Sequence, residues 1–398
     1  MKEQRPKLLV VTPRLPYPVV GGDRLRIYQI CKALSVSNDI TLVSLCESRQ
    51  ELTIPLPSDG VFERVRRVYL APWRSRLNAL LAVFSNVPLQ VAYYRSREMS
   101  TVVDDEIRNH DLALAHLVRT EVYIRGKGIP TIVEMTDAIS LNYSRSKSII
   151  GLKGLRPIIY HFEQRRLFEM ERGMLNKHTL LSMISKVDAK YLFGSPTPSN
   201  VVICGNGVSA FEIAESNLTY GTTDIAFIGN MNTLQNMDAV QWFASEVLPI
   251  LRRHGEFRLR VIGRISLRAR QRLECRAGVV VTGEVESVPA AAMGCFAAVC
   301  PMRVGAGVQN KVLEYLALGL PTVTSSVGAE GIEVQDGVHL MIADKADRVA
   351  QLLIKIHETP QLAKSLSQEG RELIGRAYRW NEVLQPLSNA VSAQVSVR

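Results

Sequence analysis

The stretch AAVCPMRVGAGVQNKVLEYLALGLPTVTSS, residues 297–326, decides the fold of this chain. It passes from an apolar run into a glycine loop, then into a helical pattern, and finally into a second apolar run. A strand, a helix and a strand in this order form a βαβ unit, in which the two strands lie parallel in one sheet. The stretch therefore predicts an α/β fold with a parallel sheet.

Apolar runs separated by helical patterns recur along the whole chain and divide it into two halves. In the first half they are residues 7–13, 39–45, 112–117, 131–135, 180–185 and 201–204, and in the second half 224–229, 257–263, 278–283, 297–302 and 321–326. Each half is predicted to be a doubly wound parallel sheet of the Rossmann type.

A polar segment between the halves, residues 210–223, shows neither helical nor strand periodicity and is predicted to hold the domain boundary. We expect an amino-terminal domain over 1–217, a carboxyl-terminal domain over 218–375 and a final helical segment over 376–398. Pro386 is expected to interrupt this last helix. The pattern leaves open whether the segment returns to the first domain.

Composition sets broad limits on the class of protein. With 398 residues, of which 46% are hydrophobic and 22% charged, the chain is typical of a globular protein of two domains. The six cysteines are scattered without metal-ligand spacing, which favours a reducing compartment and no metal site. No apolar window approaches the roughly 18 residues of a membrane-spanning helix. We therefore expect a cytoplasmic protein that contacts a membrane only at its surface.

The net charge of +10 is unevenly distributed. Residues 61–100 hold seven arginines and two glutamates, and the apolar stretch LNALLAVF (77–84) lies among them. This composition is typical of a helix lying on anionic lipid. The alternative is a helix that packs on its own domain with a solvated basic rim. Nucleic acid is not expected as a partner, because no aromatic stacking motif accompanies the basic residues.

The glycine loop indicates a site for a nucleotide. Gly305 and Gly307 let the backbone approach a ligand, and the N–H groups that begin the following helix can bind a diphosphate. Lys311 and Glu314 follow on one helix face, and a carboxylate can accept hydrogen bonds from two vicinal ribose hydroxyls. An ordinary glycine turn with a solvated Lys–Glu pair is the alternative.

The turn after the first apolar run contains a second pair of glycines, Gly21 and Gly22. Doubly wound sheets bind ligands at such a turn. Asp23 is expected to be the N-cap of the next helix. The two glycine loops, one in each domain, are expected to face each other across a cleft.

Taken in order, these features resemble the retaining glycosyltransferases of family 4. Besides the two glycine loops, the resemblance rests on Asn206-Gly207-Val208, on FIGNMNTLQNMDAVQWF (227–243) and on Gly319-Leu320-Pro321, and it covers most of the chain. It implies the GT-B fold, in which two Rossmann-like domains face a cleft. It also implies a nucleoside-diphosphate sugar as donor, retention of configuration and no metal cofactor.

The resemblance implies roles for particular residues. Glu314 holds the donor ribose, His116 contacts the transferred sugar, and residues 282–284 read the base. The remaining donor-binding positions that we expect are Gly21, Gly22, Gly229, Gly283, Gly305, Ala306, Gly307 and Val308.

The chain departs from the family pattern at three positions. Ala306 stands where an acidic residue is usual, and Asn230 and Asn236 stand where basic residues are often found. Because positive charge must offset the leaving diphosphate, we expect Arg303 and Lys311 to supply it, and replacing both with Gln should lower kcat more than stability.

The expected acceptor is a lipid-linked sugar or a growing polysaccharide in cell-surface glycan biosynthesis. The basic region places this reaction on an anionic membrane, at the cytoplasmic face of the inner membrane. Two alternatives stay open. One is a non-catalytic partner subunit that binds sugar nucleotides, suggested by Ala306 and the two asparagines. The other is a GT-B epimerase, which needs an acid/base pair of carboxylates that the glycine loops do not offer.

Overall fold

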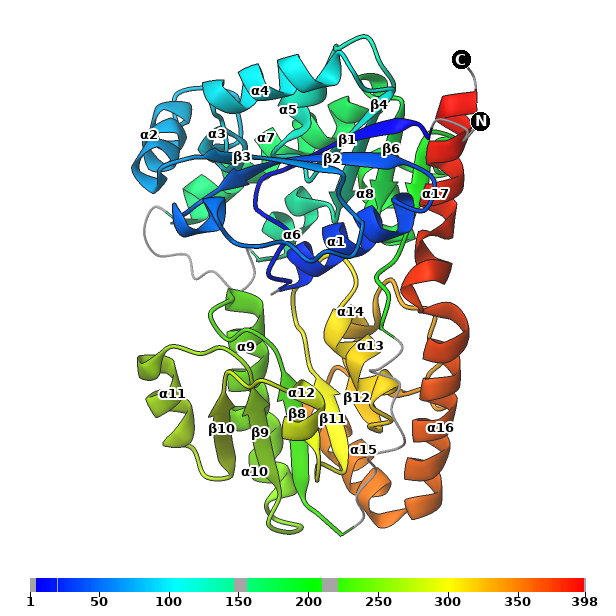
Figure 1. Ribbon diagram of the computed structural model, residues 1–398. Helices are drawn as coiled ribbons and strands as arrows, with labels where there is room; N and C mark the ends of the chain where they lie inside the picture. The colour runs from blue at the N-terminus through cyan, green and yellow to red at the C-terminus, as the bar shows by residue number, and fades with distance from the viewer. Residues whose placement is uncertain (1–4, 20, 147–155, 210–220, 397–398) are drawn as a thin grey trace. The chain divides into compact units, whose positions relative to one another are not determined.

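The computed structural model describes residues 5–19, 21–146, 156–209 and 221–396 (Figure 1). The chain divides into two compact units, of which the first comprises Met1–Gly205 and Leu384–Arg398 and the second Asn206–Val383. The expected boundary after residue 217 falls within 210–220, outside the described residues.

The described part of the first unit contains a sheet of seven parallel strands in the order β3-β2-β1-β4-β5-β6-β7. Its central strands are buried almost throughout, because helices cover both faces of a parallel sheet. The strands are β1 (Lys7–Thr12), β2 (Asp39–Cys46), β3 (Arg64–Tyr69), β4 (Leu112–His116), β5 (Thr131–Thr136), β6 (Leu180–Met183) and β7 (Val201–Ile203).

Helices lie on both sides of this sheet, with α4 and α5 on one side and α1 on the other (Figure 1). Met99 and Val103 of α4 and Tyr123 of α5 pack in one core with strand residues such as Leu9 and Val43. The helices are α1 (Gly22–Leu34), η1 (Gln50–Leu52), α2 (Pro72–Ala82), α3 (Leu89–Tyr93), α4 (Arg97–Ile107), α5 (Glu121–Ile124), α6 (Ile139–Ser146), α7 (Arg156–Gly173), η2 (Met174–Asn176) and α8 (Lys186–Phe193).

The second unit contains six parallel strands in the order β10-β9-β8-β11-β12-β13 within its described residues. The strands are β8 (Asp224–Ile228), β9 (Arg258–Ile262), β10 (Val279–Gly283), β11 (Ala297–Cys300), β12 (Thr322–Thr324) and β13 (Met341–Ile342). The helices are α9 (Leu234–Trp242), the π-helical turn η4 (Phe243–Val247), α10 (Leu248–Leu251), α11 (Leu267–Glu274), α12 (Val288–Ala292), α13 (Asn310–Ala317), α14 (Ser326–Ala329), α15 (Ala346–Glu358) and α16 (Pro360–Ala377).

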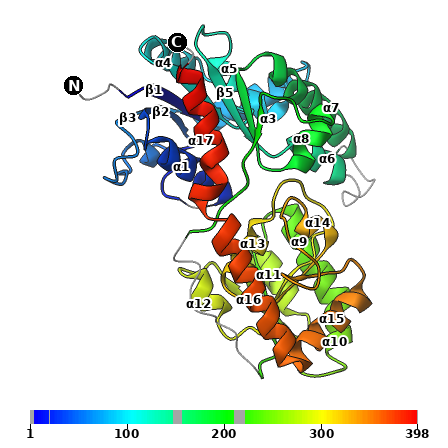
Figure 2. The same cartoon turned by 90° about the vertical axis from the view of Figure 1, so that its right-hand side faces the viewer.

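The last helix, α17 (Trp380–Ser396), contains Pro386 in its interior, so the expected interruption at this proline is wrong. The helical segment is interrupted instead at Tyr378 and Arg379, between α16 and α17. Val208 fixes this break, because its N–H donates to the Tyr378 carbonyl oxygen at 2.7 Å and it forms a β-bridge with Arg379. From Leu384 onward α17 belongs to the first unit, where it lies beside α1 (Figure 2).

All the predicted apolar runs form strands, and two strands were not predicted, β3 and β13. Strand β3 carries three arginines of the basic region. Arg64 and Arg66 form ion pairs with Glu106, with N–O distances of 3.3 and 3.2 Å. Arg67 donates to the backbone carbonyl oxygens of Leu52 and Ile54. These three arginines of the basic region therefore hold the edge of the first sheet in place and do not belong to the helix that follows.

Candidate functional site

Each sheet has one point where the order of its strands reverses direction. It lies between β1 and β4 in the first unit and between β8 and β11 in the second. Open parallel sheets bind ligands outside the carboxyl ends of their strands at such a point. The glycine loop 301–309 follows β11, Gly229 follows β8, and His116 ends β4. The fold thus brings these predicted residues to the two reversal points.

The start of α13 has the form of an anion site. No side chain caps the helix at Gln309, and the Val312 N–H donates to the Gln309 carbonyl oxygen at 2.9 Å, which leaves the N–H groups of Asn310 and Lys311 for ligand oxygens. Gly307 has a φ of +70°, which a residue with a side chain rarely adopts. Val308 is buried, and Ala306 is partly buried in the same loop. The loop 305–308, where we expect contacts with the donor, therefore lies directly before this helix start in the second unit.

Lys311 is the second residue of α13 and joins the two sides of the reversal point. Its Nζ donates to Asn236 Oδ1 at 2.7 Å and to Gln309 Oε1 at 3.3 Å, and it lies 5.5 Å from the centre of the Phe227 ring. Burial lowers the pKa of Lys311, although the negative Glu314 acts against this. Among the described residues no carboxylate forms an ion pair with Lys311, so neutral groups alone contact this ammonium.

Arg303, the other cation predicted at this loop, is held differently. Its Nε donates to Asp238 Oδ2 at 2.9 Å, and its Nη2 contacts the other oxygen of the same carboxylate. This bidentate pair offsets the charge of Arg303 within the protein. The two predicted cations therefore differ: Arg303 forms a bidentate ion pair, and Lys311 forms no ion pair among the described residues.

The two asparagines at the usual basic positions shape the loop after β8. Asn236 Nδ2 donates to the carbonyl oxygen of Asn230 at 3.0 Å, while its Oδ1 accepts from Lys311. A Cβ atom at Gly229 would lie only 2.9 Å from Asn236 Nδ2, so a residue larger than glycine needs this side chain to move. Asn236 thus fixes the ammonium of Lys311 at the place where the family pattern predicts a cation of its own.

The other predicted donor residues lie at the same edge of the second sheet. Glu314 is partly buried on α13, three residues after Lys311. Gly283 ends β10, and its carbonyl oxygen accepts from the Gly263 N–H at 2.8 Å. The Gly229 N–H donates to the carbonyl oxygen of Ile262 at 2.9 Å. These backbone hydrogen bonds join the loops after β8, β9 and β10.

In the first unit, His116 belongs to a buried charge network. Its Nδ1 lies 2.7 Å from Glu134 Oε2, and Arg26 Nε donates to Glu134 Oε1 at 2.7 Å. The exposed fractions of His116, Glu134 and Arg26 are 2%, 0% and 1%. Burial opposes the charge of Glu134, but Arg26 and His116 outweigh it and lower the pKa of Glu134 to about 2. The ionised carboxylate therefore orients the ring of His116. Sequence reasoning missed both Glu134 and Arg26.

The backbone beside this network is strained. Leu117 and Thr136 have φ angles of 64° and 62°, which residues other than glycine rarely adopt. The Leu117 N–H donates to the backbone oxygen of Glu134 at 2.7 Å, and the Thr136 N–H donates to Glu134 Oε1 at 3.0 Å. Strained residues of this kind cluster at functional sites. Here Leu117 directly follows β4, and Thr136 is the last residue of β5.

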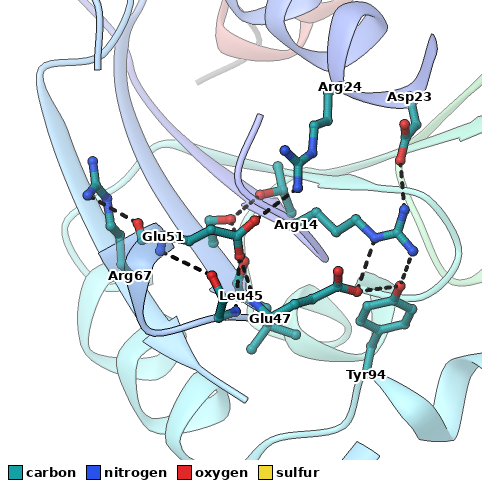
Figure 3. Close-up of polar contacts among 11 residues, drawn as sticks. Arg14, Asp23, Arg24, Leu45, Glu47, Glu51, Arg67 and Tyr94 are labelled. Carbon is teal, nitrogen blue, oxygen red and sulfur yellow. Dashed lines mark hydrogen bonds and ion pairs between the residues drawn. The ribbon is translucent and has the colours of Figure 1, made fainter. Parts of the chain in front are cut away.

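The glycine turn of the first unit begins α1. Gly21, with a φ of +97°, is the N-cap, and Gly22 is the first residue of the helix. Asp23 lies in the first turn of α1, and its Oδ2 accepts from Arg14 Nη1 at 3.5 Å (Figure 3). The expectation that Asp23 caps the helix is therefore wrong, because Arg14 engages its carboxylate.

Helix α2 presents large apolar side chains to solvent. Leu80 and Leu81 are 63% and 65% exposed, and Phe84, just beyond the helix, is 93% exposed. The helix packs on its domain through Ser75 and Ala82, as the alternative expects, but these three apolar side chains lie outside the packed face. A cavity of about 660 Å³ adjoins the helix, lined among others by Trp73, Leu77, Arg74, Arg95 and Arg97.

Two kinds of feature are absent from the described residues. No helix among them is both long enough and apolar enough to cross a lipid bilayer. No group of three or more histidines, cysteines, aspartates and glutamates in the same ranges is arranged to hold a metal ion.

Two Rossmann-like units of parallel strands define the class of fold, and similar solved structures confirm that it is GT-B. Sucrose-phosphate synthase from Thermosynechococcus elongatus matches with a TM-score of 0.74 and 12% identity, covering 99% of this chain and 100% of that chain. Anabaena HepE in complex with UDP and glucose matches with a TM-score of 0.67 and 10% identity, covering 98% and 100%. WaaG, a glycosyltransferase involved in lipopolysaccharide biosynthesis, matches with a TM-score of 0.65 and 13% identity, covering 97% and 99%.

Residues 222–359 match the family described as "Glycosyl transferases group 1". The predicted resemblance is thereby confirmed at the level of this group, and the matched residues contain the whole glycine loop. The chain is also 22% identical to a Klebsiella pneumoniae protein described as "Uncharacterized 44.6 kDa protein in cps region", over 96% of this chain and 98% of that protein.

Proposed function

We propose that this protein transfers a sugar from a nucleoside-diphosphate sugar to a lipid-linked or polysaccharide acceptor, with retention of configuration. The observation that carries the proposal is the uncapped start of α13 beside Lys311. N–H groups at a helix start and an ammonium that forms no ion pair among the described residues both favour a diphosphate. The complex of HepE with UDP and glucose, a protein of similar fold, supports a nucleotide donor.

The donor roles follow from the geometry of the second unit. Glu314 is proposed to accept hydrogen bonds from the ribose, and the backbone at 305–308 to contact the diphosphate or sugar. Gly229 permits a close approach at the same edge, and the region of Gly283 is proposed to read the base. Lys311 is proposed to offset the charge that develops on the leaving diphosphate. Arg303 contributes less, because Asp238 already offsets its charge.

His116 is proposed to contact the transferred sugar through its Nε2 atom. Its Nδ1 lies against Glu134 Oε2, which orients the ring and leaves Nε2 for the sugar. Arg26 keeps Glu134 ionised and so acts as a positioning residue. The turn at Gly21 and Gly22 is proposed to approach the same sugar.

The acceptor is proposed to lie at an anionic membrane, at the cytoplasmic face of the inner membrane. The exposed apolar side chains of α2 support this proposal, since Arg74 and Arg76 are also exposed on that helix. The similarity to a protein of a cps region supports a role in cell-surface glycan biosynthesis. All six cysteines are unpaired, which is compatible with a reducing compartment.

A transfer assay tests the proposed function. The full chain is incubated with labelled nucleoside-diphosphate sugars and a membrane extract, and the anomeric configuration of the product is determined by NMR. We expect a product of retained configuration, turnover that persists in EDTA, and loss of turnover in Glu314→Ala. Nucleotide binding without turnover on any extract would support the partner subunit instead. Isomerised sugar nucleotide would support the epimerase, and an inverted product would contradict retention.

A further inference from the structure

Arg119 is a cation of the first unit that forms no ion pair among the described residues. It lies three residues after His116, in the loop between β4 and α5, and it is partly buried. Its Nε donates to Gln90 Oε1 at 3.1 Å, and its guanidinium carbon lies 5.5 Å from the centre of the Tyr94 ring. The described residues offer its Nη1 and Nη2 no hydrogen bond and no ion pair. Two parallel N–H donors therefore remain for a ligand.

Tyr94 joins Arg119 to a second arginine. The ring of Tyr94 is 5% exposed, and Arg14 lies 5.9 Å from its centre. Arg14 Nη2 donates to the Tyr94 hydroxyl at 2.9 Å (Figure 3). Burial raises the pKa of Tyr94, while Arg119 and Arg14 act against this, as expected for a phenol between two cations.

The two arginines differ in whether nearby carboxylates offset their charge. Arg14 Nε donates to Glu47 Oε1 at 3.2 Å, and its Nη1 faces Asp23, so two carboxylates offset its charge (Figure 3). Arg119 has a neutral carboxamide as its hydrogen-bond partner, and the Nε2 of that Gln90 is buried without a partner among the described residues. Arg14 therefore holds Tyr94 in place, whereas no carboxylate among the described residues lies close enough to form an ion pair with Arg119.

The position of these arginines points to a ligand. Arg14 follows β1 and Arg119 follows β4, the two strands between which the first sheet reverses its order. The strained Leu117 lies two residues before Arg119. Asp137, which follows β5, interacts with Arg119 electrostatically without forming an ion pair; burial and Asp188 raise the pKa of Asp137 to about 6. Beyond its contacts with Gln90 and Tyr94, Arg119 forms no ion pair among the described residues, so a bound anion can supply the direct counter-charge that Asp137 does not.

We infer that Arg119 determines acceptor specificity by binding a carboxylate or phosphate group of the acceptor. The inference rests on the proposed transfer function. A guanidinium with two free parallel donors matches two oxygens of such a group, and this geometry separates it from a lysine. A uronic acid and a phosphate of a lipid carrier offer the same pair of oxygens. Arg14 and Tyr94 are positioning residues, which hold the guanidinium of Arg119 against the ring.

Binding of small acceptor probes to the full chain tests this inference. The probes are methyl glucuronide for a carboxylate, glycerol 3-phosphate for a phosphate, and methyl glucoside as the neutral control. We expect at least one anionic probe to bind about 10- to 100-fold more tightly than methyl glucoside, as for hydrogen bonds to charged groups. Tighter binding of methyl glucuronide would identify a uronic acid as the acceptor group, and tighter binding of glycerol 3-phosphate would identify a phosphate. Arg119→Gln should abolish the preference, and Arg119→Lys should keep part of it.

Arg108→Gln is the matched control, because it removes the same charge from an exposed position at the end of α4. It should retain the full preference. Equal binding of anionic and neutral probes by the wild type, or an unchanged preference in Arg119→Gln, would overturn the inference. The thermal shift with nucleoside diphosphates is measured on the same proteins. If Arg119→Gln loses the thermal shift, Arg119 binds the donor, which would also overturn the inference. If the wild type itself shows no thermal shift, the result contradicts the proposed function alone.

Discussion

The two reversal points of this protein are built from very different lengths of chain. In the second unit the glycine loop, Lys311 and Glu314 all come from residues 301–314. In the first unit Arg26 and Glu134 meet although they lie 108 positions apart in the sequence. The site in the second unit is therefore formed mainly by residues that are close in the sequence. The site in the first unit is formed by residues that only the order of the strands brings together.

The two sites also differ in how they hold charge. The network of Arg26, Glu134 and His116 is fully buried and internally compensated. Lys311 has neutral contacts and no ion pair among the described residues. Removing one member of a buried network leaves an uncompensated charge, whereas removing Lys311 leaves none. Substitutions should therefore change stability in the first unit and activity in the second.

Arg26→Met tests whether a substitution in the first unit changes stability, and we expect its effect to be the largest of those predicted here. It leaves Glu134 buried without its cation, which is expected to lower the free energy of unfolding by about 3–5 kcal/mol. Arg165→Met is the control, because its ion pair with Glu169 is exposed and contributes about 1 kcal/mol or less. Urea unfolding measures both. Equal losses in the two variants would show that the buried network does not stabilise the first unit.

Lys311→Gln tests whether a substitution in the second unit changes activity. Removing a charge that stabilises the leaving diphosphate is expected to lower kcat by about 10²- to 10³-fold, the effect of losing one oxyanion donor. Arg303→Gln should lower kcat by less than about tenfold, since Asp238 already offsets that charge. Lys364→Gln, at an exposed position of α16, is the control. Unchanged turnover in the double variant of Arg303 and Lys311 would refute a role for both residues.

The pH dependence of stability sharpens the contrast within the first unit. The pKa of Glu134, about 2, is below its usual value, so its stabilisation is present above pH of about 4.3 and is lost as the pH falls toward 2. The pKa of Glu171 is about 8, because burial outweighs the hydrogen bonds from Ser140. Its contribution is present below pH of about 4.3 and is lost as the pH rises toward 8.

Glu171→Gln should therefore reduce the decline in stability between pH of about 5 and 8, because it removes the group that must lose a proton. Unfolding free energies of wild type and variant across this range provide the measurement. Parallel curves for the two proteins would argue against a proton held by Glu171.

The exposed face of α2 predicts the smallest effect on the fold. Exchanging Leu80 and Leu81 for serine should change stability by about 0.5 kcal/mol or less, because both side chains are exposed. It should lower recovery with anionic vesicles in flotation several-fold. Leu267→Ser, equally exposed in the second unit, should float like the wild type. A wild type that shows no preference for anionic over neutral vesicles at moderate salt would contradict the membrane proposal.

Local pattern was enough to predict most strands and the glycine loop. It was not enough for Glu134 and Arg26. One signal was present, since Glu134 interrupts the apolar run 131–135, and a charge in a buried strand needs a partner. The partner itself had no signal, because Arg26 looks the same as Arg24 in the sequence of α1. Only the pairing of β4 with β5 and the packing of α1 bring the three side chains together.

The missed strands have physical reasons as well. Strand β3 reads RVRRVY, and its arginines suggested a basic surface; their partners Glu106 and the carbonyl oxygens near Leu52 are remote in sequence. Strand β13 has two residues, too few for any periodicity. Conversely, α2 was predicted from composition alone, and its exposure follows from packing through Ser75 and Ala82, which the apolar stretch does not reveal.

The central claim is that the second unit binds a nucleoside diphosphate at the start of α13, and a thermal shift assay tests it most directly. The full chain, Glu314→Ala and Lys311→Gln are heated with a panel of nucleoside diphosphates. We expect one nucleotide to stabilise the wild type by about 2.7 kcal/mol at a hundredfold excess over its Kd, and to stabilise both variants less. Equal stabilisation of all three proteins, or none of the wild type by any nucleotide, would contradict the claim.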